Sequence, residues 1–307
     1  MSRLVDPRVL ILGSPRDPTF LHTVQAMTAS GARFAVLDID AFARGGHLSG
    51  SLDEPTSLRL HTIEKTWRLA SFRSCYARFV DLPEGWEGPA ENARMQALQV
   101  AISSLDAFVV NRPTAGESNS SKPYQTVLLR RHGFDVPRSF TTNEPRLAGA
   151  FLETCPAGAI YKSNSAQRSI VQAVEVDDLD RLHLLVGCPV YFQERIRGSD
   201  VRVHVLRDQC FSVEIRSEEV DYRYDRSDQV TEGPHQLPPD IADRCVRITR
   251  SLGLEFSGID FVRSDADRRY YALEVNPMPG YHGYDLTLRG AISRRLCGQL
   301  VGSAASS

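Results

Sequence analysis

Two late apolar segments, residues 256–262 and 270–275, constrain the fold more than any other part of the chain, because polar side chains interrupt them at fixed spacing. The pattern predicts two neighbouring strands of a hairpin. Alternate residues of a strand point to one face, so Glu274 and Asn276 should project together, and a suitable register would add Asp260. An apolar strand seldom aims such groups at one another without a cation between them. This all-oxygen set therefore predicts a Mg²⁺ site, with a solvated hairpin edge as the alternative.

Composition and charge exclude several classes of protein. A chain of 307 residues with 42% hydrophobic and 24% charged residues is typical of a folded protein with two or three structural units. The net charge of -2 provides no global field, so we expect neither nucleic acid nor a membrane as a partner. The six cysteines are scattered singly, which favours reduced thiols over a zinc site. The first apolar run is too short for a signal peptide or a membrane span, so a cytoplasmic location is expected.

The first part of the chain alternates strand and helix patterns. Strands at 9–12 and 34–39 around a helix at 20–30 predict a β-α-β unit. The turn after the first strand lacks dinucleotide-binding glycine spacing, so we assign it to architecture. Residues 42–60 resemble a surface connection, since they lack periodicity. The remaining expected elements are short strands near 58–68 and 73–80, a helix at 91–105, a strand at 107–110 and a linker at 111–121.

The rest of the chain is rich in strand patterns. A helix is expected at 122–132, where Gly133 provides a stop signal, followed by an extended stretch at 136–140. Strands are then expected at 159–162, 170–174, 190–195, 201–206 and 210–215, with helices near 177–186 and 239–252. The predicted class is α/β with α+β character. We divide the chain into residues 1–118, 119–190 and 191–307.

Residues 190–205 read as a strand, a turn and a strand. Backbone groups after the first strand can pair with an adenine edge, and the carboxylates of Glu194 and Asp200 can accept hydrogen bonds from ribose hydroxyls. Arg202 alternates with apolar Val201 and Val203, so it should lie on the face opposite the core, where its guanidinium would suit phosphate oxygens. An ordinary charged hairpin fits this stretch equally well.

Two lysines precede that stretch. Lys122 begins the expected helix at 122–132, and Lys162 ends an apolar strand, so each can place a positive charge on a phosphate group. The small polar residues from Ser163 to Ser169 can fold over a triphosphate through their backbone N–H groups. The competing interpretation is that both lysines are simply solvated.

Taken in order, these motifs resemble the ATP-grasp superfamily and, within it, the RimK-like carboxylate-amine ligases. The resemblance covers roughly residues 105–290, and the first hundred residues look like the family's preceding domain. It implies an ATP-grasp fold with an N-terminal Rossmann-like pre-ATP-grasp domain that takes part in substrate binding. It also implies ATP and Mg²⁺ as cofactors, with Mn²⁺ as an alternative ion. The motifs that carry it are Lys122, Lys162, Gln193-Glu194, Asp200-Val201-Arg202, Asp260 and Glu274-Val275-Asn276-Pro277.

The same resemblance implies a role for each position. Lys122 and Lys162 would hold the α- and β-phosphates, with Ser163 and Ser169 in the phosphate loop. Gln193, Glu194, Arg195 and Ile196 would surround the adenine, and Asp200 would bind the ribose. Arg202 would contact the γ-phosphate and the acyl phosphate, while Asp260, Glu274 and Asn276 would bind the metal. Residues 211–217 and 221–224 also resemble this family, which makes Arg216 and Arg223 candidates for stabilising the transferred group.

The expected reaction is ATP-dependent ligation of a carboxylate to an amine through an acyl phosphate, with small amino acids or peptides as substrates. A homo-oligomer is compatible with this expectation. One alternative is intramolecular cyclisation of a metabolite or peptide, and another is a nucleotide-binding regulatory protein without catalysis. The chain departs from the peptide-crosslinking branch where Asn276 leads into Pro277-Met278-Pro279, a difference that argues against a ribosomal peptide as substrate.

Overall fold

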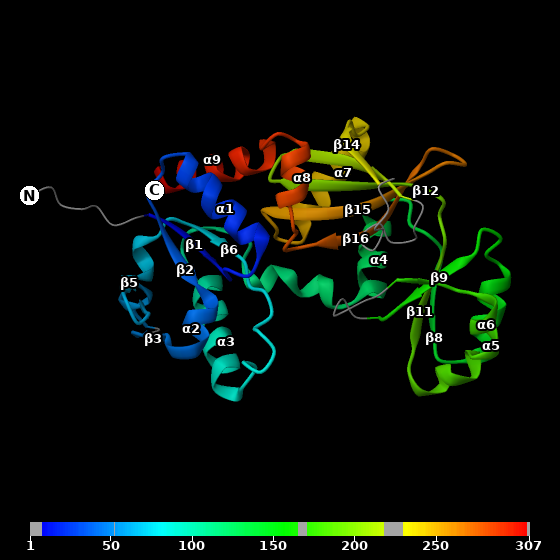
Figure 1. Ribbon diagram of the computed structural model, residues 1–307, viewed down its shortest axis with the longest axis horizontal. Helices are drawn as coiled ribbons and strands as arrows, with labels where there is room; N and C mark the ends of the chain where they lie inside the picture. Colours follow the sequence, from blue (N-terminus) through cyan, green and yellow to red (C-terminus); the bar gives the residue numbers. More distant parts are fainter. Residues whose placement is uncertain (1–7, 52, 165–170, 218–229, 306–307) are drawn as a thin grey trace, which may run out of the picture. The chain divides into compact units, whose positions relative to one another are not determined.

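The computed structural model describes residues 8–51, 53–164, 171–217 and 230–305 (Figure 1). It has a mixed α/β fold, which confirms the predicted class. The chain forms two compact units. The first unit consists of residues 1–115, 254–256 and 280–307, and the second of residues 116–253 and 257–279. Within the described ranges, no helix combines the length and apolar character needed to cross a bilayer.

The first unit is built on a parallel sheet of order β2-β1-β6-β7, formed by β1 (Val9–Gly13), β2 (Phe34–Asp38), β6 (Ser74–Ala77) and β7 (Phe108–Val110). Parallel sheets are usually covered on both faces, so their strands are apolar throughout, and every residue of β1 is buried. Figure 1 shows α1 (Pro18–Ala29) and α9 (Ala291–Ala305) on one face, and α2 (Ile39–Gly45) and α3 (Pro89–Ser103) on the other.

The expected surface connection at residues 42–60 proves to be partly regular. It contains the end of α2, β3 (His47–Ser49), η1 (Pro55–Ser57) and the start of β4 (Arg59–His61). β4 pairs with β3 and with β5 (Thr66–Arg68) in a small antiparallel sheet, which η2 (Leu69–Ser71) follows. β4 and β5 match the short strands expected near 58–68, whereas β3 was missed because three residues are too few to produce a detectable period.

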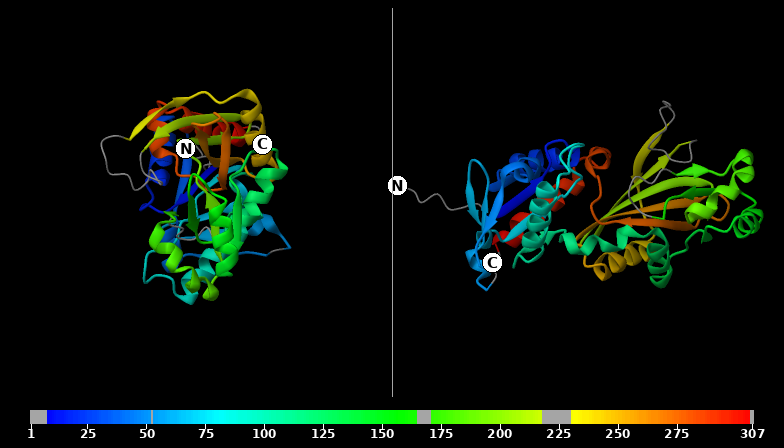
Figure 2. Two further views of the ribbon diagram at one scale, coloured as in Figure 1. Left: turned by 90° about the vertical axis from the view of Figure 1, so that its right-hand side faces the viewer. Right: turned by 90° about the horizontal axis from the view of Figure 1, so that it is seen from below.

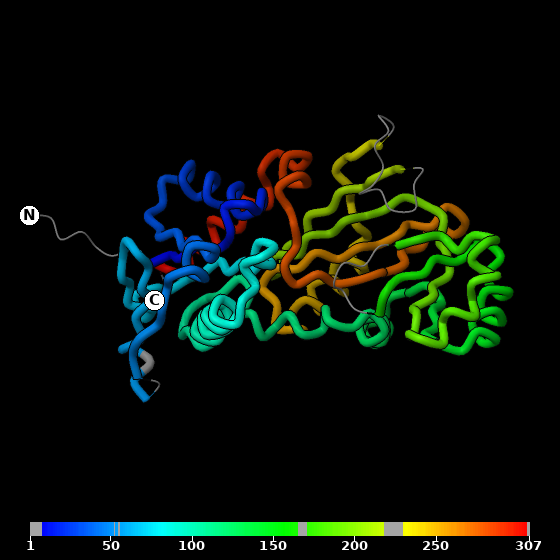
Figure 3. Tube along the Cα trace, turned by 60° about the horizontal axis from the view of Figure 1, so that its bottom comes forward, coloured from blue at the N-terminus to red at the C-terminus, as the bar shows by residue number. Residues whose placement is uncertain are grey.

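The end of the chain belongs to the first unit. Residues 280–307, which the sequence analysis grouped with residues 191–279, form α8 (His282–Thr287) and α9. Both helices pack against α1, and α9 also contacts β6. Figure 3 shows the red C-terminal segment beside the blue α1. Sequence order alone could not reveal this return to the first sheet.

The second unit contains two sheets. One has the order β10-β9-β11-β8, with β8 (Ser139–Thr142), β9 (Ala159–Lys162), β10 (Gln172–Ala173) and β11 (Val190–Glu194). Their pairings are antiparallel. Its helical elements are α5 (Pro145–Glu153), α6 (Val176–Asp180) and η4 (Leu182–Gly187). The single helix predicted at 177–186 is thus divided into two short segments.

The other sheet has the order β14-β13-β12-β15-β16 (Figures 1 and 2). Its strands are β12 (Gly198–Leu206), β13 (Gln209–Arg216), β14 (Thr231–His235), β15 (Phe256–Ser264) and β16 (Tyr270–Asn276). α7 (Pro239–Ser251) packs against β12 and β13, whereas α4 (Lys122–Arg131) packs against β16. The predicted linker at 111–121 contains η3 (Pro113–Ser120).

Candidate functional site

The hairpin of β15 and β16 has the register that the sequence required. Asp260 lies opposite Glu274, and Gly258 lies opposite Asn276. Directly opposed residues of paired strands point to the same face, so the two carboxylates and the amide share one face of the sheet. The register shifts between Asp260 and Phe261. Such bulges are common beside active sites, where they change the direction of a side chain.

Arg202 reaches this face from the neighbouring strand β12. Its Nη1 donates a hydrogen bond to Asp260 Oδ1 at 2.5 Å, and the side chain is largely buried. Gly258 leaves room for it, since a Cβ there would lie 2.4 Å from Arg202 Nη2 and 2.7 Å from Pro279 Cβ. The alternation of Arg202 with buried Val201 and Val203 therefore gives it a separate face, but that face is enclosed.

The pKa of Glu274 shows which charges surround it. Burial raises this pKa above its usual value, and the Asp260 carboxylate raises it further, whereas Lys162, Lys122 and Arg202 oppose the rise. Three elements besides the hairpin, α4, β9 and β12, thus bring a cation within electrostatic reach of one carboxylate. Two carboxylates among three cations would suit both a divalent ion and the phosphates that accompany it.

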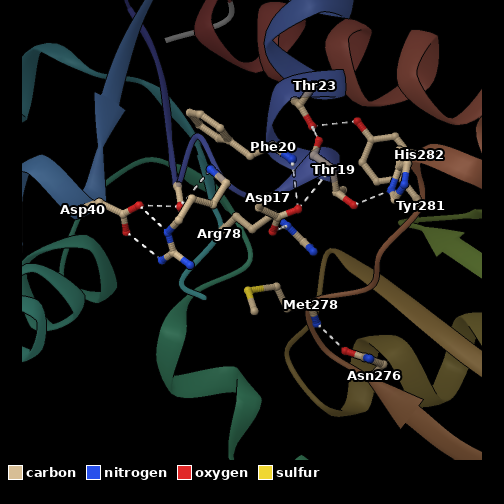
Figure 4. Close-up of polar contacts among 12 residues, drawn as sticks. Asp17, Thr19, Phe20, Thr23, Asp40, Arg78, Asn276, Met278, Tyr281 and His282 are labelled. Carbon is tan, nitrogen blue, oxygen red and sulfur yellow. Dashed lines mark hydrogen bonds and ion pairs between the residues drawn. The ribbon is translucent and has the colours of Figure 1, made fainter. Parts of the chain in front are cut away.

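The donor atoms fit a hard cation. No group of three His, Cys, Asp or Glu residues suited to a metal occurs in the part of the chain that the structure describes. The set here is instead two carboxylates and one amide, the oxygen donors that Mg²⁺ prefers when phosphate and water complete its shell. Asn276 Oδ1 accepts a hydrogen bond from the Met278 N–H at 2.9 Å (Figure 4). An amide oxygen has a second lone pair, so this bond orients the side chain without excluding a metal.

Lys162 is held by side chains of β11. Its Nζ donates to Gln193 Oε1 at 3.1 Å and lies 5.4 Å from the centre of the Tyr191 ring. Gln193 is 2% exposed, so its amide is directed into this contact. This side chain, predicted to lie near the adenine, orients Lys162, and its role beside the base stays a prediction.

Arg138 donates hydrogen bonds to both oxygens of the Glu194 carboxylate. The Arg138 backbone N–H donates to Glu194 Oε1 at 2.9 Å, and Arg138 Nε donates to Oε2 at 2.6 Å. The next residue, Arg195, donates its backbone N–H to the Gly158 carbonyl at 3.0 Å. These contacts fix the backbone at the end of β11. The Glu194 carboxylate thus has a protein partner, and its contact with a nucleotide stays a prediction.

The remaining predicted residues occupy varied positions. Asp200 lies within β12 opposite Ile215, not in a turn, and Ser163 directly follows β9. Ile196 lies in the irregular segment between β11 and β12. Arg216 ends β13 with a side chain that is 69% exposed, and its ion-pair partner Glu214 is 3.7 Å away. Ser169 and Arg223 fall outside the described residues.

Two residues of α4 were missed by the sequence analysis. Gln125 contacts the backbone of β16, and the Thr126 hydroxyl shares a 2.9 Å hydrogen bond with the Tyr191 hydroxyl. Both are buried. The available signal was their position three and four residues after Lys122, on the same face of one helix. Buried polar side chains at that spacing indicate specific partners.

A second polar cluster lies in the first unit, at the carboxyl end of its parallel sheet (Figure 4). Asp17 forms a buried ion pair with Arg78, and Arg16 binds Asp40 through Nε at 2.9 Å and Nη2 at 3.1 Å. Ser14 also donates to Asp40, at 2.6 Å. The sheet order reverses between β1 and β6, the position where open α/β sheets usually bind ligands.

Two sheets and the helix α4, which bring two lysines, an arginine and an Asp–Glu–Asn set together, define an ATP-grasp type of protein. A family model described as the RimK-like ATP-grasp domain matches residues 120–300. The chain therefore belongs to the RimK-like ATP-grasp family, and it is an ATP-dependent ligase that joins a carboxylate to an amine.

Relatives and solved structures agree with this family. A probable alpha-L-glutamate ligase from Klebsiella pneumoniae (strain 342) is 24% identical over 203 residues, which are 62% of this chain and 67% of the relative. The ATP-grasp ligase PsnB, complexed with a minimal precursor, is 26% identical with a TM-score of 0.83 over 97% of this chain and 99% of that chain. D-alanine–D-alanine ligase from Bacillus anthracis, 13% identical, shares the fold, with a TM-score of 0.59 over 98% and 96% of the two chains.

Proposed function

We propose that the enzyme uses Mg²⁺ and ATP to convert a peptide carboxylate into an acyl phosphate, which an amine then captures as an amide. The observation that carries this proposal is the environment of Glu274, where a second carboxylate and three cations surround a partly buried acid. A structure of PsnB contains a minimal precursor, Mg and ADP, and this supports the same cofactors for the present enzyme. Mn²⁺, with similar oxygen preferences, is proposed as a substitute.

In this proposal Asp260, Glu274 and Asn276 bind the metal ion, which supplies positive charge to the phosphate oxygens. Lys122 and Lys162 bind the α- and β-phosphates. A substrate carboxylate oxygen attacks the γ-phosphorus while Arg202 stabilises charge on the transferring group, and ADP departs. The amine then attacks the acyl carbon, phosphate departs, and the amine loses a proton. No nucleophile from the protein is required.

The nucleotide base and sugar receive separate proposed partners. Within Glu194, Arg195 and Ile196, the Ile196 N–H and the backbone carbonyls pair with adenine, since the N–H groups of Glu194 and Arg195 already donate to the Arg138 and Gly158 carbonyls. Asp200 accepts hydrogen bonds from the ribose. Ser163 and Ser169 belong to the loop over the phosphates. Arg216 and Arg223 stabilise the oxyanion formed during amine attack.

A peptide substrate is supported by a surface of the second unit. A cavity of about 250 Å³ lies against β9, β11 and η4, lined mainly by apolar side chains such as Leu182, Leu185 and Phe192. Exposed apolar residues adjoin it, namely Val176, Leu179, Leu184 and Val186. Acidic residues lie in the same stretch, namely Glu175, Asp177, Asp178 and Asp180. We propose that this surface binds a peptide segment combining apolar and basic residues.

Two similar solved structures favour a ribosomal peptide as the substrate, in spite of the departure at Pro277. PsnB was solved with a minimal precursor. A RiPP-associated ATP-grasp ligase from Chryseobacterium gregarium was solved with a leader and core peptide; it is 22% identical, with a TM-score of 0.83 over 96% and 97% of the two chains. Similarity across nearly the whole chain outweighs the departure at Pro277, so a precursor peptide is our proposed substrate class. We propose that the polar cluster around Arg78 and Asp17 in the first unit contributes to substrate selection.

The test is ADP release with a panel of precursor-like peptides and free amino acids, followed by product masses. A peptide that loses one water per amide, with no added mass, would indicate intramolecular ligation. A product that combines two substrates would indicate intermolecular ligation. A Glu274→Gln variant serves as the control and should release no ADP. ADP release with free amino acids but with no peptide would contradict the proposed substrate class.

A further inference from the structure

Gln125 makes two reciprocal hydrogen bonds to the backbone of one residue. Its Nε2 donates to the Val275 carbonyl at 2.7 Å, and the Val275 N–H donates to its Oε1 at 3.1 Å. The Gln125 side chain is 3% exposed and Val275 is 1% exposed. The amide of Gln125 therefore pairs with a peptide group in the way that a neighbouring strand would.

At the outer edge of β16, this contact takes the place of hydrogen bonds to a neighbouring strand. Among the described residues β16 is the edge strand of its sheet, joined on its outer side only by an isolated bridge between Tyr271 and Asp135, so no strand there satisfies the N–H and C=O of Val275. A strand residue directs both groups to the same edge, where α4 packs. A buried backbone group without a partner destabilises the folded protein. Gln125 removes that cost at this single position.

The position matters because Val275 lies between Glu274 and Asn276. A shift of the Val275 peptide would move both side chains, since each is attached to a neighbouring peptide unit. Gln125 belongs to the same helix as Lys122 and Thr126, and Thr126 contacts Tyr191 of β11. One helix thus connects the β16 edge with the sheet that carries Lys162.

We propose that Gln125 is a positioning residue for the metal site, which fixes Glu274 and Asn276 in the orientation that binds Mg²⁺. This inference rests on the proposed function, in which those two residues are metal ligands. Partners that orient metal ligands typically change metal affinity by 10–100-fold when removed. Both of these Gln125 hydrogen bonds go to the Val275 backbone between the two proposed ligands, so their loss should weaken Mg²⁺ binding selectively.

The experiment measures Mg²⁺ affinity by calorimetry, with the enzyme saturated by a non-hydrolysable ATP analogue. In Gln125→Met, which keeps the volume but loses both hydrogen bonds, we expect the Mg²⁺ dissociation constant to rise by about 10–100-fold. Affinity for the analogue without Mg²⁺ should not change. Gln125→Asn keeps an amide but is one methylene shorter, and it should shift Mg²⁺ affinity in the same direction. If Gln125→Met does not fold, the Mg²⁺ affinity of Gln125→Asn tests the proposal.

Thr249→Val is the matched control. Thr249 is buried in α7, and its hydroxyl bonds to the Cys245 carbonyl and to Ser257. The control should retain wild-type Mg²⁺ affinity. Unchanged affinity in the Gln125 variants, or an equal loss in Thr249→Val, would overturn the proposal. If Glu274→Gln also leaves Mg²⁺ binding unchanged, the metal assignment itself fails, a result that is distinct from failure of the Gln125 role alone.

Discussion

At the scale of single residues, the negative charge of Glu274 serves the proposed metal site but destabilises the metal-free fold. The pKa of Glu274 is raised by burial and by Asp260, so it exceeds the value in the unfolded chain. Raising the pH from the unfolded pKa, about 4.3, through the raised folded pKa ionises this partly buried acid and removes stability, whereas below the unfolded pKa no such loss occurs. The ionised carboxylate that the proposed reaction requires therefore lowers the stability of the metal-free protein.

Replacing Glu274 with Gln tests both effects of this charge. The variant should form no ADP, because a metal ligand is lost. It should nevertheless melt at a higher temperature than the wild type near pH 7 without Mg²⁺ or nucleotide, because the partly desolvated charge beside Asp260 is gone. The difference should vanish below about pH 4, where both proteins are neutral at this position. Thermal denaturation followed by circular dichroism across this pH range measures it, and a lower melting temperature at pH 7 would show that the three cations outweigh burial.

Arg202 should affect turnover more than nucleotide binding. We expect Arg202→Ala to reduce kcat by about 10²–10³-fold, the usual cost of removing a donor that stabilises transition-state charge. Affinity for a non-hydrolysable ATP analogue should remain within a few-fold, because the two lysines are intact. Arg244→Ala, which removes a surface ion pair on α7, is the control. Retention of full ADP release by Arg202→Ala would exclude a catalytic role.

At the scale of elements, the contact between Arg138 and the end of β11 should govern ATP affinity. Arg138 is half exposed, so its ion pair contributes little to overall stability. Its bonds to Glu194 nevertheless fix the proposed adenine-pairing backbone. We expect Arg138→Ala to raise the KM for ATP several-fold, with little change in kcat.

The control for Arg138 is Arg269→Ala, which breaks a comparably exposed ion pair with Asp267 in the turn between β15 and β16. Steady-state kinetics with varied ATP should show no change in that variant. A KM for ATP that is equal in both variants would mean that the end of β11 does not depend on Arg138.

The strands of the second unit could be predicted because their pattern is local. Alternation within β16 placed Glu274 and Asn276 on one face, and two apolar runs separated by a short turn implied the hairpin. β14 escaped detection because its sequence, Thr-Glu-Gly-Pro-His, contains two residues unfavourable in strands. The partners of Gln125, Gln193 and Glu194 could not be predicted, since each bond joins elements that are distant in sequence.

At the scale of the whole molecule, the first unit is assembled from separated segments of chain. Three side chains on one face of α1 contact the C-terminal segment, as Thr19 bonds to His282, His22 to Asp285 and Thr23 to Tyr281. Figure 4 shows the first and third of these contacts. Their spacing of three and four residues gives α1 a polar seam that specifies where residues 280–287 pack.

The first unit should therefore not fold without its last segment. In α9, Ile292, Leu296 and Leu300 are fully buried, and burial of each contributes about 1.5–3 kcal/mol. Their combined loss approaches the total stability of a typical domain, about 5–15 kcal/mol. We expect residues 8–115 alone to lack a cooperative thermal transition and dispersed amide NMR signals. Joining residues 280–305 through a long Gly/Ser linker should restore both. A cooperative transition in the short fragment would show that the parallel sheet is stable without α9.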